Sequence, residues 1–329
     1  MTSIATAAWR WAAGMAAAAI LGSASAAPYP ERAITWIVPF AVGGPTDAIA
    51  RTVAQRVATE LGQSIIVENV PGAGGTLGAM RAARAQADGY TLFVGHIGTM
   101  AAAPYLFKSL KYDPLRDFTP VFRFPDTPMV LLVKQDARYN SAADLLAEAR
   151  KHPEKLTFGT AGVGSSSHLA AEHLAATAQV KFTFVPYKGT GPAMTDLMGG
   201  QIDAMLDQTN VSLPQVQGGR LKALALTSQS EMSLFPGVPT LAGGELPGFL
   251  ASTWYGIYAP TGTPQPAIDA LRDAYMKALA DPSFTDGLRQ NGIDVLPAAQ
   301  TGPDALRDFT ASEQQKWQRV IRDAGIAPQ

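Results

Sequence analysis

Short apolar segments recur along this chain, and several are followed by a loop of small residues and then by a helix-forming segment. The first such unit spans Trp36–Asp47 and continues into Ala48–Leu61. It predicts a buried strand, a loop with two glycines, and a helix that begins at Thr46 or Asp47. The unit Leu156–Ala178 has the same order. This repetition predicts parallel α/β sheets with helices on both faces.

The loops between these strands and helices are the expected ligand-binding elements. Pro71–Gly78 is rich in glycine, but its spacing is not G-x-G-x-x-G, and the next strand ends in Gly95-His96 without an acid for a ribose. A loop beside a small-ligand cleft is therefore favoured over a dinucleotide site. A long segment separates these loops from the small-residue loop Ala161–Ser167, which predicts two sheets and hence two lobes. Ligands of such sheets bind beyond the carboxyl ends of the strands.

The remaining pattern predicts further elements. Ser141 followed by Asp144 indicates a capping box at the start of a helix. Met100–Leu110 is expected to be helical, and Lys111–Phe124 to be irregular and polar. Other strands are expected at Tyr90–Gly95, Met129–Val133, Phe182–Pro186, Ile202–Asp207, Leu221–Thr227 and Ala251–Tyr258, and other helices at Ala79–Ala87, Pro192–Met198, Gln265–Ala280, Pro282–Asn291 and Pro303–Ala324.

Composition narrows the function. Of 329 residues, 47% are hydrophobic and 16% are charged, which is a globular composition. A formal net charge of −1 argues against nucleic-acid binding and against attraction to anionic membranes. Because cysteine is absent, disulfides, thiolate metal sites and cysteine nucleophiles are excluded. His168 and His173 are five residues apart, an awkward helical spacing for a metal, so no metal or cofactor is expected.

The first 26 residues have the features of a secretory signal. Arg10 supplies positive charge, Trp11–Gly22 is an apolar run too short to span a membrane, and Ala24-Ser25-Ala26 fits a cleavage site. Cleavage after Ala26 and export to the periplasm are therefore predicted. No later segment is long and apolar enough for stable insertion into a membrane.

Six short motifs follow one another in the mature chain, and together they carry a family resemblance. The chain resembles the substrate-binding proteins of tripartite tricarboxylate transporters, often called Bug-type receptors. The motifs are Val38-Pro39-Phe40-x-x-Gly43-Gly44-x-x-Asp47-x-x-Ala50-Arg51, Val67-Glu68-Asn69-x-Pro71-Gly72-Ala73-Gly74-Gly75, Asp88-Gly89-Tyr90-Thr91-Leu92, Val185-Pro186-Tyr187-Lys188-Gly189, Gly199-Gly200-Gln201-Ile202-Asp203 and Trp254-Tyr255-Gly256-x-x-Ala259-Pro260. Ala41 departs from the family's usual proline, and Thr76 from its frequent asparagine.

The resemblance implies a type II-like, Venus-flytrap periplasmic binding protein with two crossing strands near Pro125 and Ala251. Its first lobe would comprise residues 27–125 and 252–329, and its second lobe residues 126–251. Such a receptor captures a small carboxylate, here a di- or tricarboxylate, an amino acid or an aromatic acid. It then delivers the ligand to a membrane permease. A monomer is expected.

Candidate ligand contacts are glycines, hydroxyls and a few larger side chains at two helix N-termini that would face each other from the two lobes. Each helix end offers about half a positive charge and unpaired N–H donors, which suit a carboxylate. The candidates are Phe40, Gly43, Gly44, Thr46, Thr76, Thr99, Gly164, Ser165, Ser166, Ser167, His168, Tyr187 and Asp207. Phe40, Tyr187 and Trp254 are candidate apolar walls or core residues.

Several roles stay open at this point. Asp47 is most simply a first-turn acid that holds the loop's shape. Asp207 either orders loops or meets an amine on the ligand. His168 either donates to the ligand or packs on Tyr187 or faces solvent. The rival function is a serine hydrolase with Ser166 or Ser167 as nucleophile and a histidine as base, although the chain has no G-x-S-x-G elbow.

Overall fold

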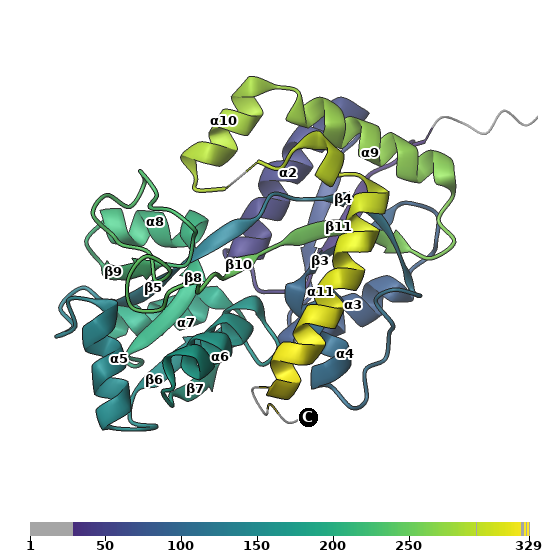
Figure 1. Ribbon diagram of the computed structural model, residues 1–329. Helices are drawn as coiled ribbons and strands as arrows, with labels where there is room; N and C mark the ends of the chain where they lie inside the picture. Colours follow the sequence, from purple (N-terminus) through teal and green to yellow (C-terminus); the bar gives the residue numbers. More distant parts are fainter. Residues whose placement is uncertain (1–28, 294, 324–325, 327, 329) are drawn as a thin grey trace, which may run out of the picture.

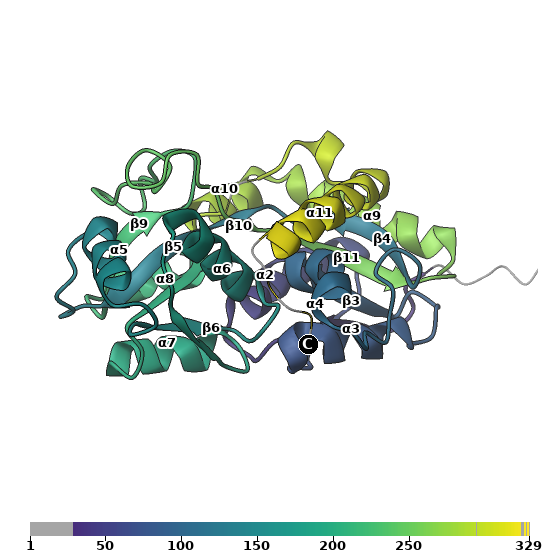
Figure 2. The ribbon, with the colours of Figure 1, turned by 60° about the horizontal axis from the view of Figure 1, so that its bottom comes forward.

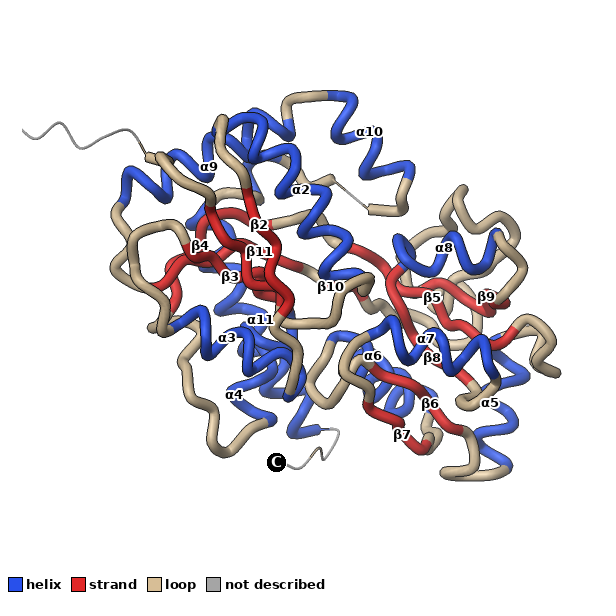
Figure 3. Tube along the Cα trace, turned by 180° about the vertical axis from the view of Figure 1, so that it is seen from behind, coloured by secondary structure: helices blue, strands red, loops and turns tan. Residues whose placement is uncertain are grey.

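The computed structural model describes residues 29–293, 295–323, 326 and 328, so the predicted signal segment lies outside the described residues. Two groups of strands, each flanked by helices, form two lobes that lie side by side (Figure 1). Figure 3 shows from behind that the two groups are separate sheets. The expected two-lobe α/β fold is confirmed.

The first sheet has the strand order β2-β1-β3-β11-β4. Strand β1 runs parallel to β2 and β3, whereas β11 is antiparallel to both of its neighbours. The sheet is therefore mixed, with its parallel half on the side of the glycine loops. The strands are β1 (Ile34–Val38), β2 (Ile65–Asn69), β3 (Thr91–His96), β4 (Phe118–Arg123) and β11 (Tyr255–Pro260).

Both faces of this sheet are buried, because successive side chains of a strand point to opposite faces. Trp36 of β1 packs in a core with α2 and α9, whereas Ile37 packs in another core with α3 and α11. Each large apolar side chain buried in this way contributes about 1.5–3 kcal/mol. The helices are α2 (Pro45–Leu61), α3 (Thr76–Ala83), α4 (Ala103–Leu106), α9 (Gln265–Leu279), α10 (Pro282–Gln290) and α11 (Pro303–Asp323).

The second sheet has the order β10-β5-β8-β6-β7, with β9 also paired to β5. Strands β6, β7 and β8 are parallel neighbours, and β5 is antiparallel to β8, β9 and β10. One core surrounds this sheet. Its elements are β5 (Thr127–Lys134), β6 (Thr157–Thr160), β7 (Thr183–Pro186), β8 (Ala204–Gln208), β9 (Leu221–Leu226), β10 (Ser252–Thr253), α5 (Ala142–Lys151), α6 (Ser166–Ala178), α7 (Thr190–Gly199) and α8 (Thr209–Gln217).

Two short connections join the sheets. The chain passes from β4 to β5 between Arg123 and Thr127, and it returns from β10 to β11 through Trp254 alone. Both connections are buried at Phe124 and Trp254. Because so few residues link the lobes, any movement of one lobe against the other must turn about these two connections.

Three local expectations were wrong. Lys111–Phe124 contains the strand β4; Pro120 obscured its pattern, and proline is tolerated there because β4 is an edge strand. Met100–Leu110 is not one helix, since a π-helical turn at Ile97–Ala102 precedes the short helix α4. The first helix begins at Pro45, whose missing N–H is harmless at the first helical position. Within the described residues, no helix is both long and apolar enough to cross a membrane.

Candidate functional site

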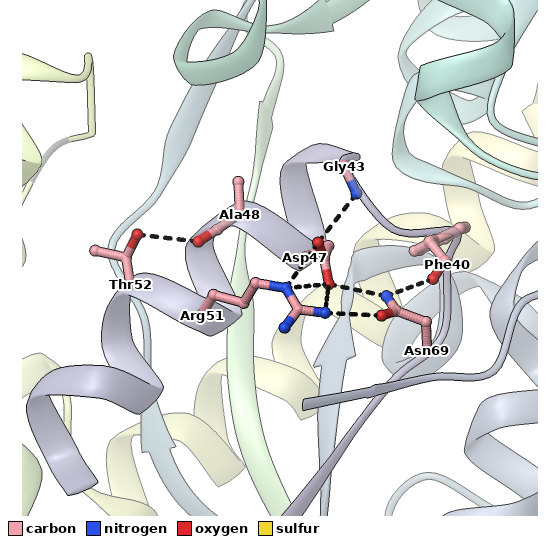
Figure 4. Close-up of polar contacts among 7 residues, drawn as sticks. All are labelled: Phe40, Gly43, Asp47, Ala48, Arg51, Thr52 and Asn69. Carbon is pink, nitrogen blue, oxygen red and sulfur yellow. Dashed lines mark hydrogen bonds and ion pairs between the residues drawn. The ribbon is translucent and has the colours of Figure 1, made fainter. Parts of the chain in front are cut away.

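The loop after β1 is held by a carboxylate at the start of α2. Asp47 accepts hydrogen bonds from the Gly43 N–H at 3.0 Å and from Asn69 Nδ2 at 2.9 Å, and it pairs with Arg51 at 2.9 Å (Figure 4). Asn69 Nδ2 also donates to the Phe40 carbonyl at 2.9 Å. Burial alone would raise the pKa of Asp47, but the bonds from Arg51, Gly43 and Asn69 lower it below its usual value. Asp47 is therefore ionised and engaged with its own loop.

The three serines at the start of α6 have different contacts. Ser165 is the N-cap, and its Oγ accepts from the His168 N–H at 3.3 Å. Ser167 Oγ accepts from the Ala161 N–H at 2.8 Å and fixes the loop after β6. Ser166 Oγ lies 3.4 Å from His96 Nδ1, which belongs to the first sheet. Two hydroxyls thus shape the loop, and the third faces the other lobe.

The N-termini of α2 and α6 line one small cavity between the lobes, which we call the central cavity. Its volume is about 20 Å³. A cavity of this size holds about one water molecule, so a larger ligand must extend into the space beside it. Six of the predicted site residues line it, together with Pro45, Ala161, Thr190 and Gln208. The six are Phe40, Gly44, Thr46, Ser165, Ser166 and Ser167.

A larger cavity of about 280 Å³ adjoins this one, and Phe40 and Ala161 line both. Its walls include the glycine loop Gly72–Gly75 of the first lobe and Tyr187 and Lys188 of the second. Tyr187, a candidate wall or core residue, lines this cavity, and its hydroxyl donates to Asp196 at 2.6 Å. The two cavities together offer one end rich in N–H donors and another end beside a lysine.

Other predicted contacts lie outside the two adjoining cavities. Thr99 is buried, and its Oγ1 accepts from the His96 N–H at 3.2 Å. Thr76 lines a separate cavity of about 220 Å³, and its hydroxyl donates to the Ala73 carbonyl at 2.9 Å. Gly43 is exposed, with its N–H bonded to Asp47. Gly164 packs against Phe107, since a Cβ there would lie 3.2 Å from that ring.

His168 is buried under the second loop. Its Nδ1 accepts from the Gly164 N–H at 3.4 Å, and its Nε2 lies 3.6 Å from a carboxylate oxygen of Glu172. The ring packs against Phe184 with centroids 5.6 Å apart. Burial lowers the pKa of His168 to about 4, so the ring is neutral near pH 7. In this conformation His168 supports the loop, and its aromatic neighbour is Phe184.

Asp207 lies behind the central cavity. Its side chain is 1% exposed, it interacts with Thr190, and Ser212 Oγ donates to it at 3.5 Å. Burial raises the pKa of Asp207 to about 7, although hydrogen bonds from Gln208, Thr190 and Ser212 oppose this shift. Its Oδ1 has no hydrogen-bond partner among the described residues. The carboxyl group is thus close to the cavity wall and titrates near neutral pH.

Sequence reasoning missed three polar residues that join the lobes. Tyr255 of β11 donates its hydroxyl proton to Gln208 Oε1 of β8 at 2.5 Å, and Thr46 Oγ1 lies 3.5 Å from the same hydroxyl. His96 at the end of β3 meets Ser166. Gln208 and His96 stand at the carboxyl ends of strands, which is the one local signal that points to them.

The contact between Ser166 and His96 bears on the hydrolase alternative. His96 Nδ1 already accepts from the Gly98 N–H at 2.9 Å, and its Nε2 has no partner among the described residues. Burial lowers the pKa of His96 to about 3. A ring that resists protonation and has no orienting carboxylate is a poor general base.

Two α/β lobes on short connections, with helix N-termini of both lobes at one cavity, define a two-lobe solute-binding receptor. Residues 49–326 match the family described as "Tripartite tricarboxylate transporter family receptor", and the chain belongs to this family. The chain is 36% identical to Protein BugT of Bordetella pertussis over 312 residues, which cover 94% of this chain and 95% of BugT.

Solved structures agree with this assignment. The periplasmic binding protein BugD superposes with a TM-score of 0.87 at 38% identity, covering 92% of this chain and 100% of BugD. MatC from Rhodopseudomonas palustris with bound malate superposes with a TM-score of 0.85 at 38% identity, covering 89% of this chain and 100% of MatC. The predicted family is confirmed.

Proposed function

We propose that this protein is an exported receptor that captures a small dicarboxylate between its lobes and delivers it to a tripartite tricarboxylate-type permease. The observation that carries the proposal is the shared cavity at the N-termini of α2 and α6. Each N-terminus presents unpaired N–H groups and a partial positive charge. Malate in the structure of MatC supports this ligand class.

The two adjoining cavities favour a ligand with acidic groups at both ends. One carboxylate would lie at the helix N-termini beside Thr46 and Ser166, and Phe40 would cover the ligand's carbon chain. The second carboxylate would extend toward Lys188 in the larger cavity. An amine is disfavoured at the helix ends, because their partial charge repels a cation. Asp207 lies behind Thr190 and orders this wall.

Closure is the signal that the receptor transmits. Contacts from both lobes to one ligand exist only when the lobes are together, so the ligand shifts the population toward the closed form. The connections at Phe124 and Trp254 are the pivots of this motion. The closed surface is then the form that a permease would recognise.

The remaining parts of the proposal concern export and assembly. The chain would be exported and cleaved after Ala26, and it would act as a monomer without a cofactor. Its lobes would comprise residues 27–125 with 252–329, and 126–251. The description of BugD as a periplasmic binding protein supports a periplasmic location for this chain. N-terminal sequencing of the mature protein checks the cleavage site, and an intact Met1 would reject it.

A thermal-shift panel tests the ligand class. Succinate, malate, citrate, aspartate and acetate are compared at equal concentration, and the dicarboxylates are expected to raise the melting temperature most. A ligand at one hundred times its Kd stabilises the folded state by about 2.7 kcal/mol. Stabilisation by none of the dicarboxylates would reject the proposal.

A hydrolase remains the second candidate only because Ser166 Oγ and His96 Nδ1 are 3.4 Å apart. We expect no turnover of p-nitrophenyl acetate above the buffer rate, since His96 is a weak base in its buried site. Turnover that disappears in Ser166→Ala would favour the enzyme instead.

A further inference from the structure

A separate cavity of about 270 Å³ lies at the junction of the lobes. It is enclosed by α6 of the second lobe, α11 of the first lobe and the returning segment 250–254; Figure 2 shows α6 and α11 beside each other there. Ser166 lines both this cavity and the central one. A ligand here would contact both lobes, and Ser166 is the residue that this cavity shares with the proposed carboxylate site.

Aromatic side chains form one wall of this junction cavity. Trp254, Phe309 and Trp317 line it, and the rings of Trp254 and Phe309 are T-shaped with centroids 5.2 Å apart. The buried Glu313 accepts from both indoles, at 3.0 Å from Trp254 Nε1 and 3.2 Å from Trp317 Nε1. Because both indole N–H groups are satisfied, the rings offer mainly carbon surface to a ligand and are already held in place.

Lys316 is the cation among the residues that line the cavity, and the two acids that line it are each already paired with a cation. Asp126 is paired with Arg123 at 2.7 Å, and Glu313 is paired with Lys316 at 3.2 Å as well as with the indoles. An ammonium has three donors, and Lys316 uses one of them on Glu313 while its side chain is 57% exposed. Burial, and to a smaller extent the positive charge of Lys316, lowers the pKa of His173.

We propose that the junction cavity is a second ligand site, which takes a small monocarboxylate with one aromatic ring. The ring lies among Trp254, Phe309 and Trp317, and the carboxylate meets Lys316 at the rim. An apolar cavity of about 150 Å³ accepts benzene, so the larger volume here accommodates one ring with its carboxylate. Aromatic packing and one charge-assisted hydrogen bond supply the affinity.

Benzoate titration by calorimetry tests the site. The wild-type protein is expected to bind benzoate, and Ala170→Trp is expected to weaken binding at least tenfold. Ala170 is buried on α6 and lines the junction cavity, so an indole there fills it. Gly44→Val alters only the central cavity and is expected to leave benzoate affinity within twofold. Circular dichroism and thermal unfolding confirm that each variant is folded.

A second variant tests the rim without disturbing the core. Lys316→Gln is expected to reduce the preference for benzoate over benzamide by about fivefold, because the charge-assisted bond is lost. Three outcomes would overturn the proposal: no benzoate binding by the wild type in the millimolar range, loss of binding in Gly44→Val, or an unchanged benzoate-to-benzamide preference in Lys316→Gln. Because Gly44 lines the central cavity and not the junction cavity, benzoate binding by Gly44→Val separates this site from the proposed dicarboxylate site.

Discussion

At the level of single residues, the negative charge of Asp47 beside an expected anion site is explained by its partners. Arg51 neutralises it, and Gly43 and Asn69 occupy its oxygens, so the carboxylate holds the loop (Figure 4). Gly44, in contrast, lines the central cavity, and this cavity stays open because glycine has no side chain. Small residues at the helix ends thus leave the space that the proposed carboxylate would enter.

Gly44→Val is predicted to reduce dicarboxylate affinity at least about tenfold while the fold is kept. The backbone of Gly44 suits any residue, and a Cβ would lie 3.5 Å from the Ala41 carbonyl oxygen, an ordinary contact. The added methyl groups instead fill the central cavity. Ser166→Trp is predicted to have the same effect. Calorimetry measures the affinity, with Gly287→Val on α10 as a control; equal affinity in all three variants would contradict the proposed site.

Asp207 gives a prediction about pH. Its raised pKa of about 7 means that the folded state holds a proton that the unfolded state has released. The stability from this group is complete below pH 4 and is lost as pH rises through 7. Asp207→Asn is therefore predicted to gain stability relative to the wild type between pH 5 and pH 8. Urea unfolding at both pH values measures this gain, and the exposed Asp136→Asn should show none.

At the level of elements, two helices of the second lobe begin at serine N-caps that have different roles. Ser141 forms a capping box with Asp144 on α5, away from the cavities, as the sequence predicted. Ser165 caps α6 and also lines the central cavity. The same local device stabilises one helix and, in the other, also fixes the donors of the proposed binding site.

Ser141→Ala and Ser165→Ala are each predicted to lower the free energy of unfolding by about 1 kcal/mol, since each removes an N-cap. Only Ser165→Ala is predicted to weaken dicarboxylate binding as well, because Ser165 lines the central cavity and Ser141 does not. Chemical denaturation and calorimetry on both variants separate the two effects. Equal affinity of the two variants would show that the cap of α6 has no part in binding.

At the level of the whole molecule, polar contacts join the two lobes. Tyr255 joins Gln208 and Thr46, and His96 meets Ser166, so each lobe supplies partners to the other. In the proposed closure these contacts would form and break together, because short connections at Phe124 and Trp254 join the sheets. The affinity for the ligand should then depend on these contacts between the lobes, because they help to populate the closed form that binds the ligand.

Tyr255→Phe is predicted to weaken dicarboxylate binding about fivefold, because the closed form loses one buried hydrogen bond of about 1 kcal/mol. X-ray scattering of the ligand-free variant should show a larger radius of gyration than the wild type. Tyr258→Phe is the matched control, since its hydroxyl bonds to Thr310 at 2.7 Å within the first lobe. A fivefold loss in both variants would indicate general destabilisation and contradict the role of Tyr255.

The sequence by itself determined the strand–loop–helix units, the cap at Ser141 and the glycine loops, because these depend on neighbours a few residues away. Ordered motifs also indicated the family and a fold of two lobes. Only the tertiary structure decided that Tyr255 meets Gln208 and that Ser166 meets His96, since these pairs are 47 and 70 residues apart. It also decided that Asp207 is buried behind Thr190, because burial results from packing between elements.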